Sequence, residues 1–308
     1  MRHVIVAPSL FWTSTYTSVK CALYVPVFND YAEPAQIVEL ACLAEASGWD
    51  GIFIWDHIAL RPGGSLEVVD ATVTLAAVAQ ATSTIQLGPM ISPLARRRPW
   101  KFAKEIATLD RLSKGRVIVG TGLGEPVGAD FESFGEDGTS AGRASRLDEG
   151  LSLLDRFLRD EEVDHVGKHY SISKARLRPT PVQQPRPPIW VAACLPYKRG
   201  FRRAAQWEGC FPLKIPSKRS GNTDWTSWWL TPPELNEVAE TIDQRRGNLD
   251  NYVLVSTGST NSLSGTAAKQ QLDSFSNNGA NWWLEWIPDE TGTYSKTAER
   301  IDRGPPSY

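Results

Sequence analysis

The sequence predicts one (β/α)8 barrel over residues 19–308, with loops inserted at the C-terminal mouth. Eight short apolar segments alternate with helical patterns along the 308 residues. Strands that alternate with helices form parallel sheets, and eight such pairs favour a closed barrel over an open sheet. Several of the segments are apolar throughout, as in parallel strands buried on both faces. Residues 1–18 have a basic start and a short apolar patch, which we interpret as an extension and not as a secretory signal.

The first half of the chain supplies four strands, expected at residues 21–28, 51–55, 85–92 and 116–122. Helical spacing of apolar residues begins near Pro34, a favoured first-turn residue, and Gly48 ends that helix. Asp70 caps the second helix, and the third runs from Pro99 to Leu112. A leucine stripe over 147–158 then predicts a longer helix.

The second half supplies strands at residues 188–194, 209–213, 251–257 and 281–287. Thr231 and Glu234 form a capping box for a helix that runs to about Arg246. The segment 160–188 is polar and proline-rich, which predicts a loop with a small excursion near 169–173. Long insertions at 126–142, 160–187 and 214–230 are typical of lids or binding loops.

Composition describes an ordinary globular protein. The net charge is -2, which argues against nucleic acid or an anionic membrane as partner. No apolar run approaches the roughly 20 residues of a membrane span. The four cysteines lack CxxC spacing and are expected to be buried thiols in a reducing cytoplasm (Cys21, Cys42, Cys194 and Cys210). No metal site is predicted.

Catalytic candidates follow the second strand. His57 closes Trp55-Asp56-His57 and is expected at the mouth, where an imidazole acts as a general base or holds an intermediate. Asp56 alternates to the opposite side of the strand, which favours orienting a loop over pairing with His57. From the pattern alone, such an Asp-His pair is more often structural.

A glycine-rich segment ends the fourth strand. Gly122 and Gly124 would let the backbone approach a ring or a phosphate closely. The segment is no dinucleotide fingerprint, because no helix begins at its third glycine. Glu125 follows directly, as either a proton donor or a solvated loop carboxylate.

Two cationic segments are candidate anion sites. The turn after the fifth strand precedes a helix, and a helix N-terminus with nearby cations favours anions; its candidates are Ala193, Cys194, Tyr197, Lys198 and Arg199. Arg96, Arg97 and Arg98 follow the third strand and are expected to face the mouth, as a solvated patch or as a phosphate site.

Tryptophans gather in the loop after the sixth strand. Trp225, Trp228 and Trp229 are expected at the same mouth as Trp55 and His57. They would wall an apolar substrate pocket, or instead form a packed interface within the chain or with a second subunit. The pattern leaves both interpretations open.

Several strings together resemble the luciferase-like monooxygenase family, barrel enzymes that use FMN or the deazaflavin F420. The resemblance runs from about Val19 to Pro306 and rests on AEASGWDGIFIWDH, ARRRPWKFAKEIATLDRLSKGR, FESFG, RLDEGLSLLDRF, QPRPPIWVA and IDRGPP. It implies that the Asp56-His57 pair adjoins the flavin and that Glu125 serves as an acid in the F420 branch. It also implies a non-prolyl cis peptide after the third strand, within the cofactor-contacting residues Met90, Ile91 and Ser92.

Departures from the family narrow these implications. Bacterial luciferases place a phosphate-binding arginine where this chain has Leu123, and relatives use Ser or Thr near Cys194 and Tyr197. F420-dependent sugar-phosphate dehydrogenases place a tryptophan where this chain has Leu60 and Arg61. The arginines at 96–98 would then suit a phosphate or the acidic tail of F420. Light emission and sugar-phosphate oxidation are both disfavoured.

The resemblance implies a flavin-dependent oxidoreductase, with FMN slightly favoured. Reduced FMN, supplied by a flavin reductase or by NAD(P)H, would let the enzyme oxygenate a small apolar substrate, with His57 stabilising the oxygen adduct or moving protons. The alternative is F420-dependent hydride transfer with His57 and Glu125 handling protons. Two other classes remain: a non-catalytic flavin-binding protein, and a barrel hydrolase with Glu125 and Glu285 as its carboxylate pair. A homodimer is expected.

Overall fold

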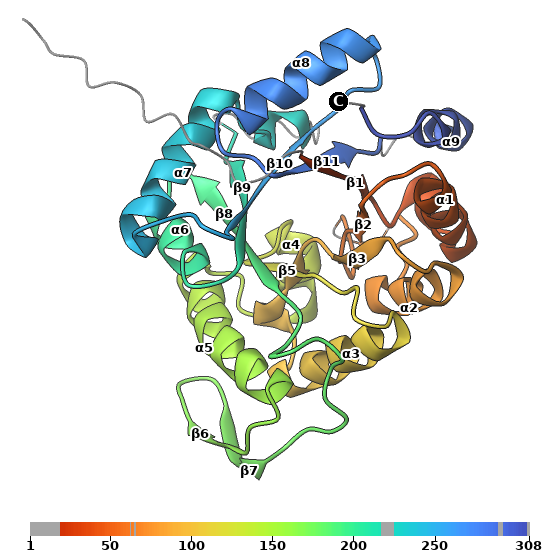
Figure 1. Ribbon diagram of the computed structural model, residues 1–308. Helices are drawn as coiled ribbons and strands as arrows, with labels where there is room; N and C mark the ends of the chain where they lie inside the picture. The colour runs from red at the N-terminus through yellow and green to blue at the C-terminus, as the bar shows by residue number, and fades with distance from the viewer. Residues whose placement is uncertain (1–18, 62, 65, 217–224, 289–291, 307–308) are drawn as a thin grey trace, which may run out of the picture.

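The computed structural model describes residues 19–61, 63–64, 66–216, 225–288 and 292–306 and forms a ring of parallel strands surrounded by helices (Figure 1). The expected extension at 1–18 lies outside the described residues. The strand order is β3-β2-β1-β11-β10-β9-β8-β5-β4, and an isolated parallel bridge between Leu87 and Val117 brings β3 beside β5. The predicted (β/α)8 barrel is confirmed.

All eight predicted barrel strands are present, the third in two pieces. Their bounds are β1 Lys20–Val25, β2 Gly51–Ile54, β3 Gln86–Pro89, β4 Ser92–Pro93, β5 Val119–Gly122, β8 Ile189–Leu195, β9 Gly209–Lys214, β10 Val253–Gly258 and β11 Trp282–Trp286. The break between β3 and β4 contains a cis peptide bond between Met90 and Ile91, within the region that the family resemblance indicated.

Eight helices follow the strands in turn: α1 Pro34–Ala46, α2 Ala71–Ala81, α3 Pro99–Leu112, α5 Ser140–Leu158, α6 Lys198–Ala204, α7 Pro232–Arg246, α8 Gly265–Ser276 and α9 Tyr294–Asp302. Their caps agree with the sequence. The Asp70 carboxylate accepts the N–H of Val73 at 2.8 Å, and Thr231 with Glu234 forms the predicted capping box.

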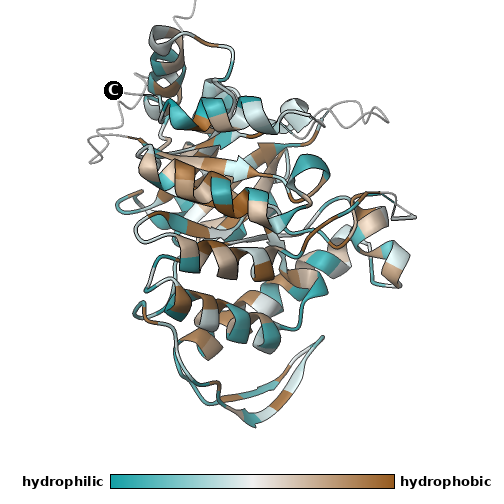
Figure 2. Ribbon diagram, turned by 90° about the vertical axis from the view of Figure 1, so that its right-hand side faces the viewer, coloured by the Kyte–Doolittle hydropathy of each residue, from teal (hydrophilic) through white to brown (hydrophobic). Residues whose placement is uncertain are grey.

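Short elements occupy the insertions. The excursion near 169–173 is an antiparallel hairpin of β6 Val163–Val166 and β7 Ser171–Ala175, which projects from the barrel (Figure 2). The insertion after β5 contains α4 Val127–Asp130 and η3 Glu132–Phe134. The remaining short turns are η1 Asn29–Tyr31, η2 Leu94–Arg96 and η4 Trp225–Trp228.

Alternation along the strands separates two apolar layers. Side chains inside the barrel form one cluster of Ala22, Phe53, Met90, Ile118, Trp190, Phe211, Val255, Trp282 and Leu284. Side chains on the outer faces pack against the helices in a second, larger cluster. Burial of both faces explains why the strands are apolar throughout.

The third strand passes very close to β5. A Cβ built on Gly88 would lie 1.8 Å from the carbonyl oxygen of Ile118, so the strands can approach only because residue 88 has no side chain. Leu87 exchanges backbone hydrogen bonds with Arg116 and Ile118 across this junction, at 3.1 and 2.9 Å.

The cysteines and helices bear on two further expectations. Cys21 and Cys210 are buried as expected, whereas Cys42 is exposed on α1, so the prediction that all four are buried was wrong. None of the helices in the described residues combines the length and apolar character that crossing a bilayer requires.

Candidate active site

A cleft of about 1930 Å³ opens at the C-terminal ends of the strands. Typical ligand pockets measure about 300–1,000 Å³, so the cleft has room for a cofactor and a substrate together. It brings together most of the predicted site residues: Trp55, Asp56, His57, Met90, Ile91, Gly124, Glu125, Ala193, Cys194, Tyr197, Lys198, Arg199, Trp225, Trp228 and Trp229.

His57 is held by a carboxylate that the sequence analysis missed. Its Nδ1 lies 2.8 Å from Oδ2 of Asp130, whose side chain is fully buried. The other oxygen of Asp130 accepts the backbone N–H groups of Ile58 and Ala59 at 2.8 and 3.0 Å. Since a carboxylate only accepts, Nδ1 carries the proton and Nε2 is the ring nitrogen left for chemistry. Nε2 has no hydrogen-bond partner in the described chain.

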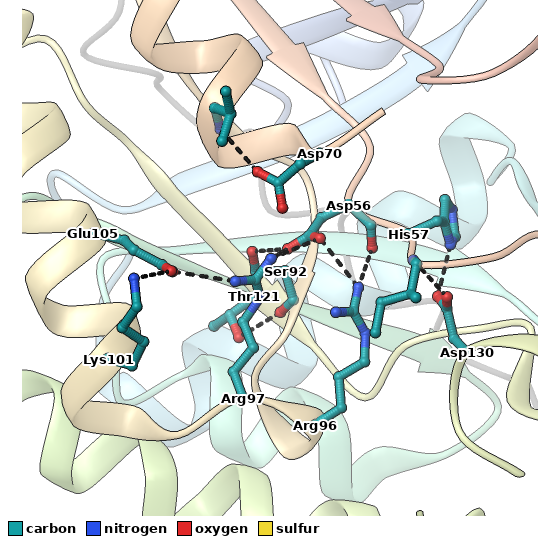
Figure 3. A network of polar contacts seen from close by, with 12 residues as sticks. Asp56, His57, Asp70, Ser92, Arg96, Arg97, Lys101, Glu105, Thr121 and Asp130 are labelled. Carbon is teal, nitrogen blue, oxygen red and sulfur yellow. Dashed lines mark hydrogen bonds and ion pairs between the residues drawn. The ribbon is translucent and has the colours of Figure 1, made fainter. Parts of the chain in front are cut away.

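Asp56 points away from His57 into a buried ionic network (Figure 3). Its carboxylate accepts from Arg97 at 2.8 and 2.6 Å, from Arg96 at 3.1 Å and from the hydroxyl of Ser92. Burial alone would raise the pKa of Asp56, but Arg97, Arg96 and Ser92 outweigh it and hold that pKa below its usual range. As alternation predicts, Asp56 orients the Arg96–Arg97 turn and does not pair with His57.

The arginine run does not supply the predicted anion site. Arg96 and Arg97 are engaged by Asp56, and Arg97 also pairs with Glu105 at 3.2 Å. Arg98 lies over the ring of Trp100. The expectation that these cations face the mouth was wrong, because a buried carboxylate next to them needs compensating charge.

Two of the predicted cofactor contacts also lie outside the cleft lining. Ser92 is fully buried and donates to Asp56. A Cβ on Gly122 would lie 2.4 Å from Cδ1 of Ile91, so Ile91 occupies the space that the missing side chain leaves. Ile91, which does line the cleft, is therefore the surface offered at this point.

Glu125 stands at the rim of the cleft with 35% of its side chain exposed. Arg143 of α5 lies 3.5 Å from its carboxylate and also donates to the carbonyl oxygens of Gly124 and Gly138. Arg143 thus joins both ends of the loop that carries Glu125 and Asp130.

The proposed hydrolase pair does not form. Glu285 lies on β11 with Trp283 on the outer face, fully buried and away from the cleft. It accepts from the backbone N–H and hydroxyl of Thr260 at 2.6 and 2.9 Å, and from Nε1 of Trp283 at 2.8 Å. Because strand residues alternate, Glu285 faces outward while Leu284 lies in the barrel interior and Trp286 lines the cleft.

One end of the cleft is cationic. Lys198, Arg199 and Arg202 of α6 line it, are exposed, and have no ion-pair partner in the described residues. Arg203, by contrast, is paired with Asp148 at 2.5 Å. Burial and the nearby Glu125 raise the pKa of the Cys194 thiol to about 12, so this cysteine is no thiolate nucleophile.

Aromatic rings form the other end. Trp55 packs against Trp225 and Trp286 at centroid distances of 5.2 and 5.0 Å, and Trp229 lies 5.6 Å from Trp286. Trp55 also contacts the ring of His57 at 5.7 Å. The cleft therefore has a charged end and an aromatic end, with His57 beside the aromatic end.

The sequence profile described as luciferase-like monooxygenase matches residues 1–206. This chain belongs to the luciferase-like monooxygenase family. Among curated proteins it is 34% identical over 166 residues to an F420-dependent glucose-6-phosphate dehydrogenase of Kineococcus radiotolerans, covering 52% of this chain and 47% of that protein. A protein of the same name from Amycolatopsis mediterranei is 31% identical over 167 residues, covering 52% and 48%. The chain thus spans about half the length of these relatives.

Solved structures of low identity share the fold of this family member. An F420-dependent tetrahydromethanopterin reductase from Methanopyrus kandleri matches with a TM-score of 0.70 and 16% identity, over 93% of this chain and 98% of that one. An FMN complex of the oxygenating component of 3,6-diketocamphane monooxygenase from Pseudomonas putida matches with a TM-score of 0.70 and 15% identity, over 92% and 95%. At such identities the likeness concerns the fold alone.

Three residues important to this family member's cleft escaped the sequence analysis. Asp130 lies 73 residues from His57, in a segment with no local signal except an acid among small residues. Arg143 lies in the helix predicted from a stripe of leucines. Tyr24 lies in an apolar segment that predicts a buried strand. Buried polar groups in apolar patterns were the available signal.

Proposed function

We propose that this protein is an F420-dependent oxidoreductase that transfers hydride between the deazaflavin and a small organic substrate. The observation that carries the proposal is His57, anchored at Nδ1 by the buried Asp130 and lining a cleft with room for two ligands. A positioned imidazole of this kind takes up or releases the proton that accompanies hydride transfer.

The cleft's residues fit an acidic cofactor. Ile91, backed by the buried Met90, offers an apolar surface at the strand ends. Lys198, Arg199 and Arg202 offer charge that no other described group neutralises. When bound, a deazaflavin supplies the chemistry of accepting or giving a hydride. Its phosphate and glutamate tail would lie against the three cations.

The choice of F420 over FMN revises the slight preference drawn from the sequence. The curated relatives described above are named F420-dependent, and Leu123 stands where luciferases carry an arginine for the FMN phosphate. Three exposed cations also suit a tail longer and more acidic than one phosphate.

The chain's own residues would divide the work as follows. Nε2 of His57 moves a proton to or from the reacting oxygen, while Asp130 fixes the ring and stabilises its cationic form. Glu125, held near Arg143, is a second proton-handling group at the rim. The tryptophans above the site exclude water.

Fluorescence titrations with F420, with the deazaflavin lacking its phosphate and glutamate tail, and with FMN test this proposal. We expect micromolar binding of F420, at least ten-fold weaker binding of the tailless deazaflavin, and weaker binding of FMN. Binding of FMN alone would replace the proposal with the FMN monooxygenase and call for oxygen-uptake assays. Binding of none would overturn the flavin assignment.

A pair of matched variants locates the tail. Lys198→Ala/Arg199→Ala should weaken F420 binding about three- to ten-fold and leave the tailless deazaflavin unaffected, since exposed ion pairs contribute about 0.2–1 kcal/mol each. Lys168→Ala/Arg245→Ala removes the same charges from exposed sites outside the cleft and should change neither affinity. Equal effects of the two pairs would mean that only net charge matters.

A further inference from the structure

The aromatic end of the cleft is built mainly from rings, and no lysine or arginine of the described residues belongs to the ring cluster. We call Tyr24, Trp55, Trp225, Trp229 and Trp286 the aromatic wall; they contact one another at centroid distances between 5.0 and 6.5 Å. Leu213 and Ile215 continue this surface. Flat apolar groups pack well on such rings, and charged groups are costly to bury there.

Tyr24 brings an uncommitted hydroxyl to this wall. It lies at the C-terminal end of β1 and packs against Phe211 at 5.5 Å and Trp55 at 5.4 Å. Its hydroxyl has no hydrogen-bond partner in the described chain, although Tyr24 lines the cleft. The other hydroxyl here, that of Thr257, already donates to the carbonyl oxygen of Leu284 at 3.0 Å.

Near pH 7 the phenol of Tyr24 is uncharged and acts as a hydrogen-bond donor. Burial raises the pKa of its phenol well above the usual value, so the proton stays on the oxygen. The indole N–H groups of Trp55 and Trp229 are also buried without an acceptor in the described residues. Those two indole groups are enclosed by the ring packing, so the donor that the wall presents to the cleft is the Tyr24 hydroxyl.

We infer that the substrate is an uncharged, largely apolar molecule with a hydrogen-bond-accepting oxygen, namely a ketone or the matching secondary alcohol. Tyr24 is the specificity-determining residue that donates to this oxygen. The inference rests on the proposed function and names its substrate class.

The chemistry balances with the groups on hand. In alcohol oxidation the C–H bond breaks and its electron pair leaves with the hydrogen as hydride to the cofactor. The hydroxyl proton passes to Nε2 of His57 and the C=O bond forms; ketone reduction is the reverse. The ring of Trp55 contacts those of both Tyr24 and His57, at 5.4 and 5.7 Å, so a substrate packed on Trp55 would lie near both polar groups.

The same wall disfavours the sugar phosphate named in the curated relatives. Lys214, which ends β9 beside this region, is paired with Glu234 at 3.0 Å and does not line the cleft. A phosphate placed on the wall would lose its hydration without gaining a described cation, and sugar hydroxyls would find few acceptors.

Tryptophan fluorescence of the F420-loaded and the unloaded protein tests the inference. The ligands are 4-tert-butylcyclohexanone, its analogue with an exocyclic methylene in place of oxygen, and glucose 6-phosphate. We expect the ketone to bind about three- to ten-fold more tightly than the methylene analogue, the value of one neutral hydrogen bond. Tyr24→Phe should abolish this preference, and glucose 6-phosphate should not bind.

Tyr31→Phe is the matched control. The hydroxyl of Tyr31 is bonded to Oγ1 of Thr297 at 3.0 Å in the core, so its loss should lower Tm and keep the ketone preference. Tyr24→Phe should leave Tm nearly unchanged and abolish the ketone preference. Each of three results would overturn the inference: a ketone preference that survives Tyr24→Phe, equal binding of ketone and methylene analogue by the wild type, or saturable binding of glucose 6-phosphate to the F420-loaded protein.

The cofactor readout keeps the two proposals separate. Deazaflavin fluorescence in the same samples reports whether F420 is bound. Loss of F420 binding overturns the proposed function, whereas glucose 6-phosphate binding to the F420-loaded protein overturns only the substrate class.

Discussion

At the N-terminal end of the barrel, charged side chains are saturated with partners, while at the mouth several polar groups have none. Arg116 donates five hydrogen bonds at 2.7–3.0 Å to Ala79, Thr82, Ile85 and Ser113. The Glu45 carboxylate accepts the N–H groups of Ser83, Thr84 and Ile85. At the mouth, no partner occurs in the described chain for the Tyr24 hydroxyl or for Nε2 of His57.

The difference separates folding from ligand binding along the barrel axis. A satisfied group contributes to the free energy of unfolding, and its removal leaves its partners unpaired. A polar group that has no partner and faces the cleft gains no hydrogen bond on folding and is available to a ligand. Variants at the two ends should therefore change different measurements.

The largest effect is expected from His57→Gln. Loss of general acid-base catalysis should lower kcat by about 10²–10⁴-fold. Because the Gln amide can still donate a hydrogen bond to the buried Asp130, Tm should change little. Steady-state kinetics with F420 and thermal melts of the same preparation check this. A large fall in Tm would mean that His57 stabilises the fold, and the proposed difference between the two ends of the barrel would not hold.

Arg116→Ala should give the largest loss of stability. Four backbone carbonyl groups lose a charged donor, which should lower the free energy of unfolding by about 3 kcal/mol. Urea unfolding measures it, and F420 affinity of the folded fraction should stay unchanged. Arg116→Lys keeps the charge without the planar fork and should recover only part of the loss.

Asp130→Asn tests the His57–Asp130 pair with a smaller expected effect. The amide can still accept from Nδ1 but no longer stabilises a cationic ring, so kcat should fall about 10–100-fold. The ketone affinity of the aromatic wall should be retained, because Asp130 lies outside the cleft lining. If kcat is unchanged, His57 does not become charged during turnover.

At the N-terminal end of the barrel, Glu45 should make the free energy of unfolding depend on pH. Burial of Glu45 would raise its pKa, but the N–H groups of Thr84, Ile85 and Ser83 lower it to about 2. A carboxyl with a lowered folded-state pKa stabilises fully above its unfolded value and loses that contribution as pH falls from about 4.5 to about 2.

The expected contribution of Glu45 is about 1–2 kcal/mol, allowing for screening at this partly exposed site. Unfolding curves between pH 5 and about 2 measure it. Glu45→Gln should flatten that part of the profile. If the wild-type and Glu45→Gln profiles run parallel, Glu45 is not a source of stability.

The sequence predicts the barrel well because its strands are buried on both faces and read as apolar runs. The third run, 85–92, was expected as one strand, but backbone pairing divides it between two neighbours, and no residue pattern reports that division. Helix boundaries followed caps such as Asp70 and Thr231, which act through local hydrogen bonds.

The candidate site was predictable only where it is local. His57 follows its strand directly, and the tryptophans share one loop. Asp130 meets His57, and Asp56 meets Arg97, only through the fold, so charges that appear free in sequence are paired in space. Glu285 shows the reverse error: alternation along 282–286 turns it outward, and the sequence does not say which set of residues faces in.

The junction beside Gly88 links the two ends. β3 pairs with β2 and β4 with β5, so in the described chain the ring is completed there by the Leu87–Val117 bridge and its two backbone hydrogen bonds. Next along the chain come Met90 and Ile91, which line the cleft. If a cofactor packs against Met90 and Ile91, the amides of residues 87 and 118 at the neighbouring junction should exchange hydrogen more slowly in its presence. Hydrogen exchange at these two amides would then report both ligand binding at the mouth and the integrity of the strand junction that closes the ring.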